Sequence, residues 1–107
     1  MNQKIQEKHP AVWEIILDQL QVMKINGFPM LAYLGAKRFV GLGDDRDGSL
    51  MVFFPNYKVH IIFDAGSDLY NLQIHKGKFP KDILLNVING VYADQLAGII
   101  HREMGSR

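Results

Sequence analysis

The chain of 107 residues carries 12 Lys and Arg against 11 Asp and Glu, which gives a formal net charge of +1 at pH 7. This balance excludes the strongly basic surface of a general nucleic-acid binder, so any anion binding has to be local. The chain has no cysteine, which excludes disulfides, thiolate catalysis and zinc sites with cysteine ligands.

The composition, with 48% hydrophobic and 21% charged residues, is typical of a folded protein, and the length suits one domain over residues 1–107. Residues 1–20 lack the uninterrupted apolar core and the small-residue cleavage site of a secretory signal. No apolar run approaches the roughly 20 residues of a membrane-spanning helix. We therefore expect a single cytoplasmic domain without a membrane partner.

Apolar residues recur at intervals of three and four between residues 10 and 26, which is the period of an amphipathic helix. Pro10 suits an early helical position, and Asn26 followed by Gly27 favours a left-handed stop. The pattern predicts an N-terminal helix over this range.

The period then becomes strand-like. Five β-rich runs follow: MLAYL (30–34), RFVGL (38–42), LMVFF (50–54), KVHIIF (58–63) and LYNLQIH (69–75). Segments of turn composition, rich in Gly, Asp, Pro and Asn, separate these runs. The spacing predicts an antiparallel β-meander of four or five strands.

The helical period returns from residue 80 to about residue 103, where apolar residues form a wide face. Gly90 and Gly98 inside this range each cost roughly 1 kcal/mol relative to alanine and suggest a kink or a close approach to the sheet. We therefore predict an α+β fold of order α-β-β-β-β(-β)-α, with the N-terminal and C-terminal helices packed on one face of the sheet.

The turns predict how the strands align. A three-residue loop at 46–48, with Gly48 in a left-handed conformation, would pair Leu42 with Val52. A two-residue loop at 55–56 would pair Val52 with Val59. The predicted core face contains the apolar positions that these pairings bring together: Val40, Leu42, Leu50, Val52, Phe54, Val59, Ile61, Tyr70, Leu72 and Ile74.

A four-residue loop at 64–67 would continue this alignment by pairing Ile61 with Tyr70. The opposite face of the sheet then carries ten residues: Phe39, Met51, Phe53, Lys58, His60, Ile62, Leu69, Asn71, Gln73 and His75. Gly41 and Gly43 would leave a shallow floor beside them.

That opposite face is only half polar, because Phe39, Met51, Phe53, Ile62 and Leu69 are large and apolar. An apolar patch of this kind more often marks an interface than plain solvent exposure. We therefore expect a non-enzymatic interaction module that self-associates, as a homodimer or larger homo-oligomer, or binds a protein partner through this face. The ten residues are its predicted binding residues.

The stretch GDDRDG, residues 43–48, could in principle hold a metal or a phosphate. An EF-hand with Gly48 as its sixth residue would place Gly43 and Phe54 at two ligand positions, where neither can serve. A dinucleotide fingerprint starting at Gly41 would need a glycine in place of Arg46 and a helix afterwards. The composition instead favours a tight turn.

Catalytic and metal-binding patterns are weak. Ser49 and Ser67 fall in predicted turns with no histidine nearby, so no serine–histidine–acid arrangement is expected. The four histidines, His9, His60, His75 and His101, show no metal-ligand spacing. We expect no catalytic residue, no metal and no cofactor, while an acid–base pair assembled only by folding stays open.

An alternative function rests on the basic run at residues 75–81, which would lie at the start of the second predicted helix. Helix N-termini bind anions through free N–H groups, and Lys76, Lys78 and Lys81 would add positive charge. With Lys58, Phe53 and His60 from the sheet, this patch could contact nucleic acid or a phosphate ligand. Pro80 and Asp82 oppose such a site.

Overall fold

The computed structural model describes residues 10–77 and 82–105. In these ranges the elements follow in the order α1 (Val12–Val22), β1 (Lys24–Ile25), β2 (Phe28–Pro29), α2 (Met30–Leu34), β3 (Arg38–Gly43), β4 (Gly48–Phe53), β5 (Tyr57–Asp64), β6 (Leu69–Lys76), β7 (Ile83–Val91), a short 3-10 helix (Ala93–Gln95) and α3 (Leu96–Gly105).

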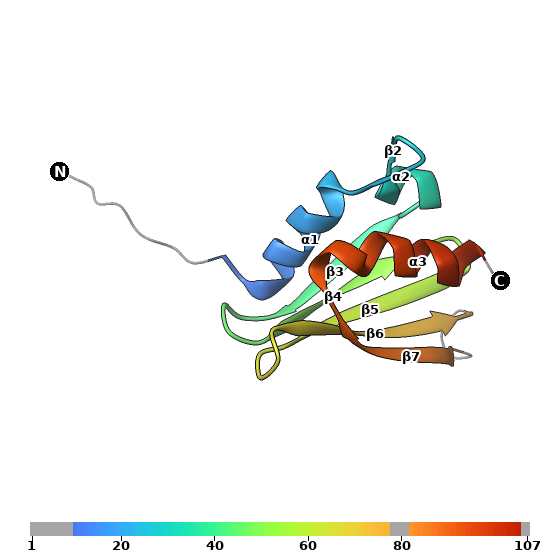
Figure 1. Cartoon of the computed structure of the whole chain (residues 1–107). Coiled ribbons are helices and arrows are strands. Elements are labelled where there is room, and N and C mark those ends of the chain that lie inside the picture. The colour runs from blue at the N-terminus through green and yellow to red at the C-terminus, as the bar shows by residue number, and fades with distance from the viewer. Residues whose placement is uncertain (1–9, 78–81, 106–107) are drawn as a thin grey trace.

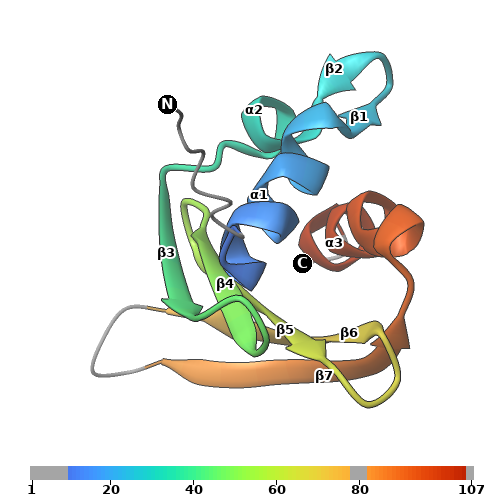
Figure 2. The same ribbon diagram turned by 90° about the vertical axis from the view of Figure 1, so that its left-hand side faces the viewer.

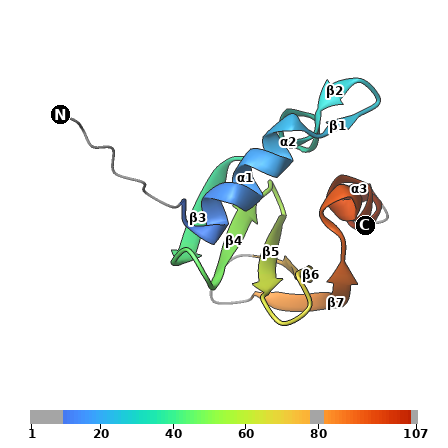
Figure 3. The same ribbon diagram turned by 60° about the vertical axis from the view of Figure 1, so that its left-hand side comes forward.

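Strands β3 to β7 form one antiparallel sheet in the order β3-β4-β5-β6-β7, hereafter the main sheet (Figure 1). Helices α1 and α3 lie on the same side of this sheet (Figures 2 and 3). The predicted α+β class, with a β-meander between an N-terminal and a C-terminal helix, is confirmed.

Helix α1 ends at Val22, four residues before the predicted stop. Asn26 and Gly27 do adopt left-handed conformations, with φ values of 53° and 83°. Instead of ending the helix they make the two-residue turn between β1 and β2, for which Asn-Gly is the preferred sequence. The prediction of positive φ was right, and the prediction of a helix up to residue 26 was wrong.

The run 30–34 is helix α2 rather than the first predicted strand. Met, Leu and Ala are good helix formers, and Gly35 closes the turn in a left-handed conformation with φ of 79°. The Ala36 N–H donates to the Leu31 carbonyl at 2.8 Å, which satisfies an end carbonyl of the helix.

Residues 83–91 are the edge strand β7 rather than the first half of a helix. This run of β-branched and aliphatic residues also fits a helical period, but as a strand it pairs its backbone with β6. Gly90, at φ of 71°, has a backbone conformation that no right-handed helix contains. Only the later part of the predicted helix is helical, and the predicted residues 80 and 81 lie outside the described residues.

Strand β3 pairs with β4 in a register that differs from the predicted one. Gly43 lies opposite Gly48, and Phe39, rather than Leu42, lies opposite Val52. The loop contains four residues instead of three, because Asp44 Oδ1 accepts the Arg46 and Asp47 N–H groups at 2.9 and 3.0 Å. The slip is an odd number of residues, so it exchanges the two faces of β3.

The next two hairpins keep the predicted faces. Val52 pairs with Val59, as predicted, across the two-residue loop at 55–56. Ile61 pairs with Leu72 rather than with Tyr70, because the loop begins one residue later, after Asp64. This slip is an even number, so each side chain stays on its predicted face.

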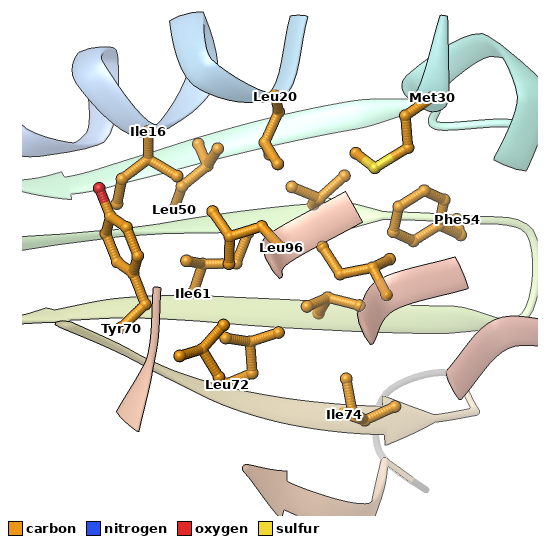
Figure 4. Packing of buried hydrophobic residues seen from close by; sticks show 14 of the residues in the cluster. Ile16, Leu20, Met30, Leu50, Phe54, Ile61, Tyr70, Leu72, Ile74 and Leu96 are labelled. Carbon is orange, nitrogen blue, oxygen red and sulfur yellow. The ribbon is translucent and has the colours of Figure 1, made fainter. Parts of the chain in front are cut away.

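Buried apolar side chains form one cluster between the main sheet and the helices (Figure 4). Eight predicted core-face residues are buried: Leu50, Val52, Phe54, Val59, Ile61, Tyr70, Leu72 and Ile74. Val40 and Leu42 are not, because the exchanged faces of β3 turn them away from the helices. The helices contribute Ile16, Leu20, Met30, Leu96 and Ile100, each with no exposed surface.

Helix α1 crosses β3 and β4 closely, at two glycines. A Cβ atom on Gly41 would overlap the indole ring of Trp13, and one on Gly48 would lie 2.9 Å from Cβ of Val12. Glycine in a strand often marks such a close approach. The predicted open floor at Gly41 is therefore wrong, since the space is filled by Trp13.

No helix in residues 10–77 and 82–105 has the length and apolar character needed to cross a bilayer.

Candidate functional site: the outer face of the main sheet

The outer face is the side of the main sheet that points away from α1 and α3. The strand registers place on it Arg38, Val40 and Leu42 from β3; Ser49, Met51 and Phe53 from β4; Lys58, His60 and Ile62 from β5; Leu69, Asn71, Gln73 and His75 from β6; and Leu84 and Val87 from β7. Nine of the ten predicted binding residues are in this set; Phe39 is not.

Phe39 lies on the helix side because it pairs with the buried Val52. Its predicted place on the outer face is wrong, for the same reason that Val40 and Leu42 are not in the core. On the outer face, Arg38, Val40 and Leu42 replace Phe39, Gly41 and Gly43, so the exchange adds two aliphatic side chains and one charged side chain.

Four apolar side chains from three neighbouring strands lie on this face: Val40, Leu42, Met51 and Ile62, hereafter the apolar cluster. Val40 lies opposite Met51, and Ser49 lies between Leu42 and Ile62. Leu42 is 45% exposed, and the others are partly exposed. A hollow of ≈ 410 Å³, lined in part by Leu42 and Ile62, continues the cluster toward the β3–β4 turn. None of the described elements covers the cluster, since α1 and α3 pack on the other face.

Strands β5 and β6 supply the polar part of the outer face. His60 Nε2 lies 2.7 Å from Ser49 Oγ on β4, so the two side chains share a hydrogen bond. This contact corrects the expectation that Ser49 has no histidine nearby. Burial lowers the pKa of His60, and the neighbouring His75 and Lys58 lower it further, against a hydrogen bond with Gln73.

The Ser49–His60 pair is poorly arranged for nucleophilic catalysis. Ser49 is only 7% exposed, so a substrate carbonyl could hardly reach its Oγ. In a serine–histidine–acid triad an acidic partner stabilises the charged histidine, whereas the groups that act on His60 are Gln73, His75 and Lys58. The lowered pKa favours the neutral ring, which suits a structural link between β4 and β5.

At one end of the face, Lys58 donates to Asp82 Oδ2 at 2.7 Å, and His75 Nδ1 lies 3.3 Å from Asp82 Oδ1. The hydrogen bond from Lys58 lowers the pKa of Asp82, and His75 acts in the same direction. Asp82 therefore ties β5 and β6 to the start of β7. It also neutralises a lysine that the alternative function needs for an anion.

The other residues of the outer face include one polar side chain that bonds within the sheet and three apolar side chains. Asn71 Oδ1 accepts the Gly90 N–H at 3.1 Å, across a bulge in the β6–β7 pairing. Leu69 is partly buried and lies at the far end of the face, opposite Asp64. Leu84 and Val87 add exposed apolar surface from β7. Sequence reasoning missed these two because it made residues 83–91 helical.

The alternative anion site loses its main structural premise. Among the described residues that follow Gly77, Asp82 precedes strand β7, which starts at Ile83, and helix α3 starts only at Leu96. Lys76 lies over the Tyr57 ring, with Nζ 5.9 Å from the centroid, and Lys78 and Lys81 lie outside the described residues.

The acidic stretch 44–47 is a turn. The Asp44 N–H donates to the Asp47 carbonyl at 2.8 Å, and the Asp44 carboxylate accepts two further amides of the loop. Those amide hydrogen bonds lower the pKa of Asp44. Within residues 10–77 and 82–105, no three histidine or acidic side chains come together as a metal-binding group.

Comparisons with models of protein families, with curated proteins and with solved structures found no match to this chain.

Proposed function

We propose that this protein is a non-enzymatic interaction module that self-associates through the outer face of the main sheet, as a homodimer. The observation that carries the proposal is the apolar cluster of Val40, Leu42, Met51 and Ile62, which lies on the sheet face that α1 and α3 leave uncovered. Apolar surface gathered on an uncovered face is typical of protein interfaces.

The surroundings of the cluster also suit an interface. Interfaces combine an apolar centre with a polar rim. The cluster is bordered by His60, Gln73 and Asn71 on β5 and β6, whose hydrogen bonds are already satisfied in part. Burying this rim in an interface would therefore leave few polar groups without a hydrogen-bond partner.

A second copy of the chain is the partner that we propose. The net charge of +1 means that two copies repel each other weakly. A two-fold axis would use the same patch on both copies, which is the commonest arrangement of soluble homo-oligomers. A cytoplasmic location belongs to the same proposal and is supported by the lack of cysteine.

Leu42→Lys tests this function. The substitution places a charge at the most exposed position of the apolar cluster, and a two-fold dimer contains that position twice. If each lysine in the interface costs about 1–2 kcal/mol, the two lysines should weaken the dimer by about 2–4 kcal/mol, which raises Kd roughly 30-fold or more. Sedimentation velocity over a wide range of protein concentration measures the change.

Val22→Lys is the matched control. Val22 is 77% exposed at the end of α1, on the helix side of the sheet. It introduces the same charge in place of a similar aliphatic side chain, and we expect it to dimerise like the wild type. Equal loss of association in both variants would point to a general charge effect and not to this face.

A further inference from the structure

A cavity of ≈ 530 Å³ lies at the end of the main sheet where β4 turns into β5. Among the described residues its lining comprises Lys37, Arg38, Phe53, Phe54, Pro55, Asn56, Tyr57, Lys58, Gly77 and Asp82. The volume falls within the range of small-molecule sites, which is roughly 300–1,000 Å³. The cavity shares no residue with the apolar cluster, although Arg38, Phe53 and Lys58 of its lining belong to the same outer face.

Backbone hydrogen bonds hold the walls of the cavity in place. The Lys37 N–H donates to the Phe53 carbonyl at 2.7 Å and fixes the start of β3 against β4. The Phe54 N–H donates to the Tyr57 carbonyl at 2.8 Å and closes the turn between them. A cavity with such fixed walls binds a ligand without a large ordering cost.

The charges in the lining are unequal. Lys58 is paired with Asp82 at 2.7 Å, so these two groups largely cancel. Lys37 and Arg38 form no salt bridge with any described residue. An excess of positive charge therefore remains at the β3 side of the cavity, and it favours an anion there.

Arg38 is oriented for anion binding. Its guanidinium lies over the Phe53 ring, with Cζ 4.3 Å from the centroid. Stacking on an aromatic ring holds the guanidinium plane and leaves its N–H groups free to donate at the edge. Such a fork matches the two oxygens of a carboxylate or a phosphate.

Apart from Asn56 and Gly77, the rest of the described lining is aromatic and apolar, with Tyr57, Phe54 and Pro55 beside the turn. Flat side chains of this kind bind planar rings through stacking and burial. We propose that the cavity binds a small aromatic anion, a planar ring that carries one phosphate or carboxylate group. Arg38 pairs with the anionic group, Lys37 adds charge, and the ring lies against Tyr57 and Pro55.

Isothermal titration calorimetry of the full chain tests the site with four probes. Adenosine 5′-monophosphate and 4-hydroxyphenylacetate each combine a ring with an anion, and they distinguish a phosphate ligand from a carboxylate ligand. Inorganic phosphate carries only the charge, and adenosine carries only the ring. We expect one of the two combined probes to bind with a stoichiometry of one per chain, and the two partial probes to bind at least about tenfold more weakly.

Arg38→Gln should weaken the binding of that combined probe about tenfold or more, because it removes a charge-assisted hydrogen bond. Arg46→Gln is the matched control, since it removes the same charge from the exposed turn at the other end of β3, and it should bind like the wild type. Backbone amide shifts in the wild type give a readout that needs no variant, and the largest shifts should fall on residues 37–38 and 53–58.

Three results would overturn the proposal: neither combined probe binds, inorganic phosphate binds as tightly as the nucleotide, or Arg38→Gln binds like the wild type. Amide shifts centred elsewhere would do the same. Because Leu42 does not line the cavity, Leu42→Lys should keep its affinity for the probe even when it no longer dimerises. Failure of one proposal is therefore separable from failure of the other.

Discussion

Gly41→Ala should destabilise this protein by more than an ordinary strand substitution. A Cβ atom at this position would lie 2.6 Å from Cε2 of Trp13 and still closer to two other indole atoms. Carbon atoms in contact are normally about 3.5–4.0 Å apart, so α1 would have to move by roughly 1–2 Å. Overpacking of this kind costs typically 1–3 kcal/mol, and alanine recovers part of it by restricting the unfolded chain. We expect a net loss of about 2 kcal/mol.

Urea unfolding followed by tryptophan fluorescence is the direct assay, since Trp13 is the single tryptophan of the chain. Gly98→Ala is the control, because a Cβ at Gly98 in α3 meets nothing within 4 Å and should stabilise by up to about 1 kcal/mol. Wild-type stability in Gly41→Ala would refute the close approach of α1. It would also refute the register that turns Val40 and Leu42 outward.

Three further substitutions test individual contacts. His60→Gln should flatten the dependence of stability on pH. Burial lowers the pKa of His60 in the folded protein, so as the pH falls the unfolded chain takes up this proton before the folded chain does. The stability of the wild type therefore falls as the pH drops below about 6.5. For one proton, the unfolding free energy cannot change by more than about 1.4 kcal/mol per pH unit, and the partial exposure of His60 makes the change smaller. Urea midpoints at several pH values measure this change. Tyr70→Phe removes the 2.9 Å hydrogen bond from its hydroxyl to Gln19 Oε1 and should lower the unfolding free energy by about 1 kcal/mol in urea titrations. Asp44→Ala should lower the melting temperature with or without Ca²⁺, because its carboxylate accepts two loop amides. Asp45→Ala should leave the melting temperature unchanged, since within the described residues the Asp45 side chain accepts no hydrogen bond from a loop amide.

Local turn signals and alternating apolar residues were sufficient to predict the centre of the fold. The Pro55–Asn56 loop and the pairing of Val52 with Val59 were predicted directly from the sequence, because apolar residues that prove to be buried recur at every second position on both strands. An even slip at the β5–β6 turn left the faces unchanged, so the polar half of the outer face was also predicted correctly.

The β3–β4 hairpin shows where such reasoning stops. Two loop lengths fit the same Asp- and Gly-rich segment, and they differ by an odd slip that exchanges the faces of β3. The choice depends on how α1 docks, since Gly41 must face Trp13 and Gly48 must face Val12. The two glycines could have given the signal, because strand glycines often mark a close approach.

The two errors in secondary structure have a common origin in short apolar runs, which fit either period. At Met30–Leu34 the residue types and the following Gly35 favour a helix more than a strand. At Ile83–Val91 the decisive factor is tertiary, because β7 pairs with the open edge of β6. The presence of Gly90 in this run already argued against a helix, because glycine is unfavourable inside helices.

The chemistry of the candidate site was less predictable than its shape. The Ser49–His60 contact and the link from Lys58 to Asp82 join residues that are 11 and 24 positions apart. Only the correct register and the correct position of β7 bring these groups together. Arg38 was likewise missed, because its stacking on Phe53 depends on the β3 register.

Sedimentation velocity on the wild type, Leu42→Lys and Val22→Lys tests the central claim most directly, because it asks whether the apolar cluster on the outer face joins two copies of the chain. We predict a concentration-dependent dimer for the wild type and Val22→Lys, and a monomer for Leu42→Lys. A wild type that stays monomeric at every concentration, or a Leu42→Lys variant that dimerises like the wild type, would contradict the account.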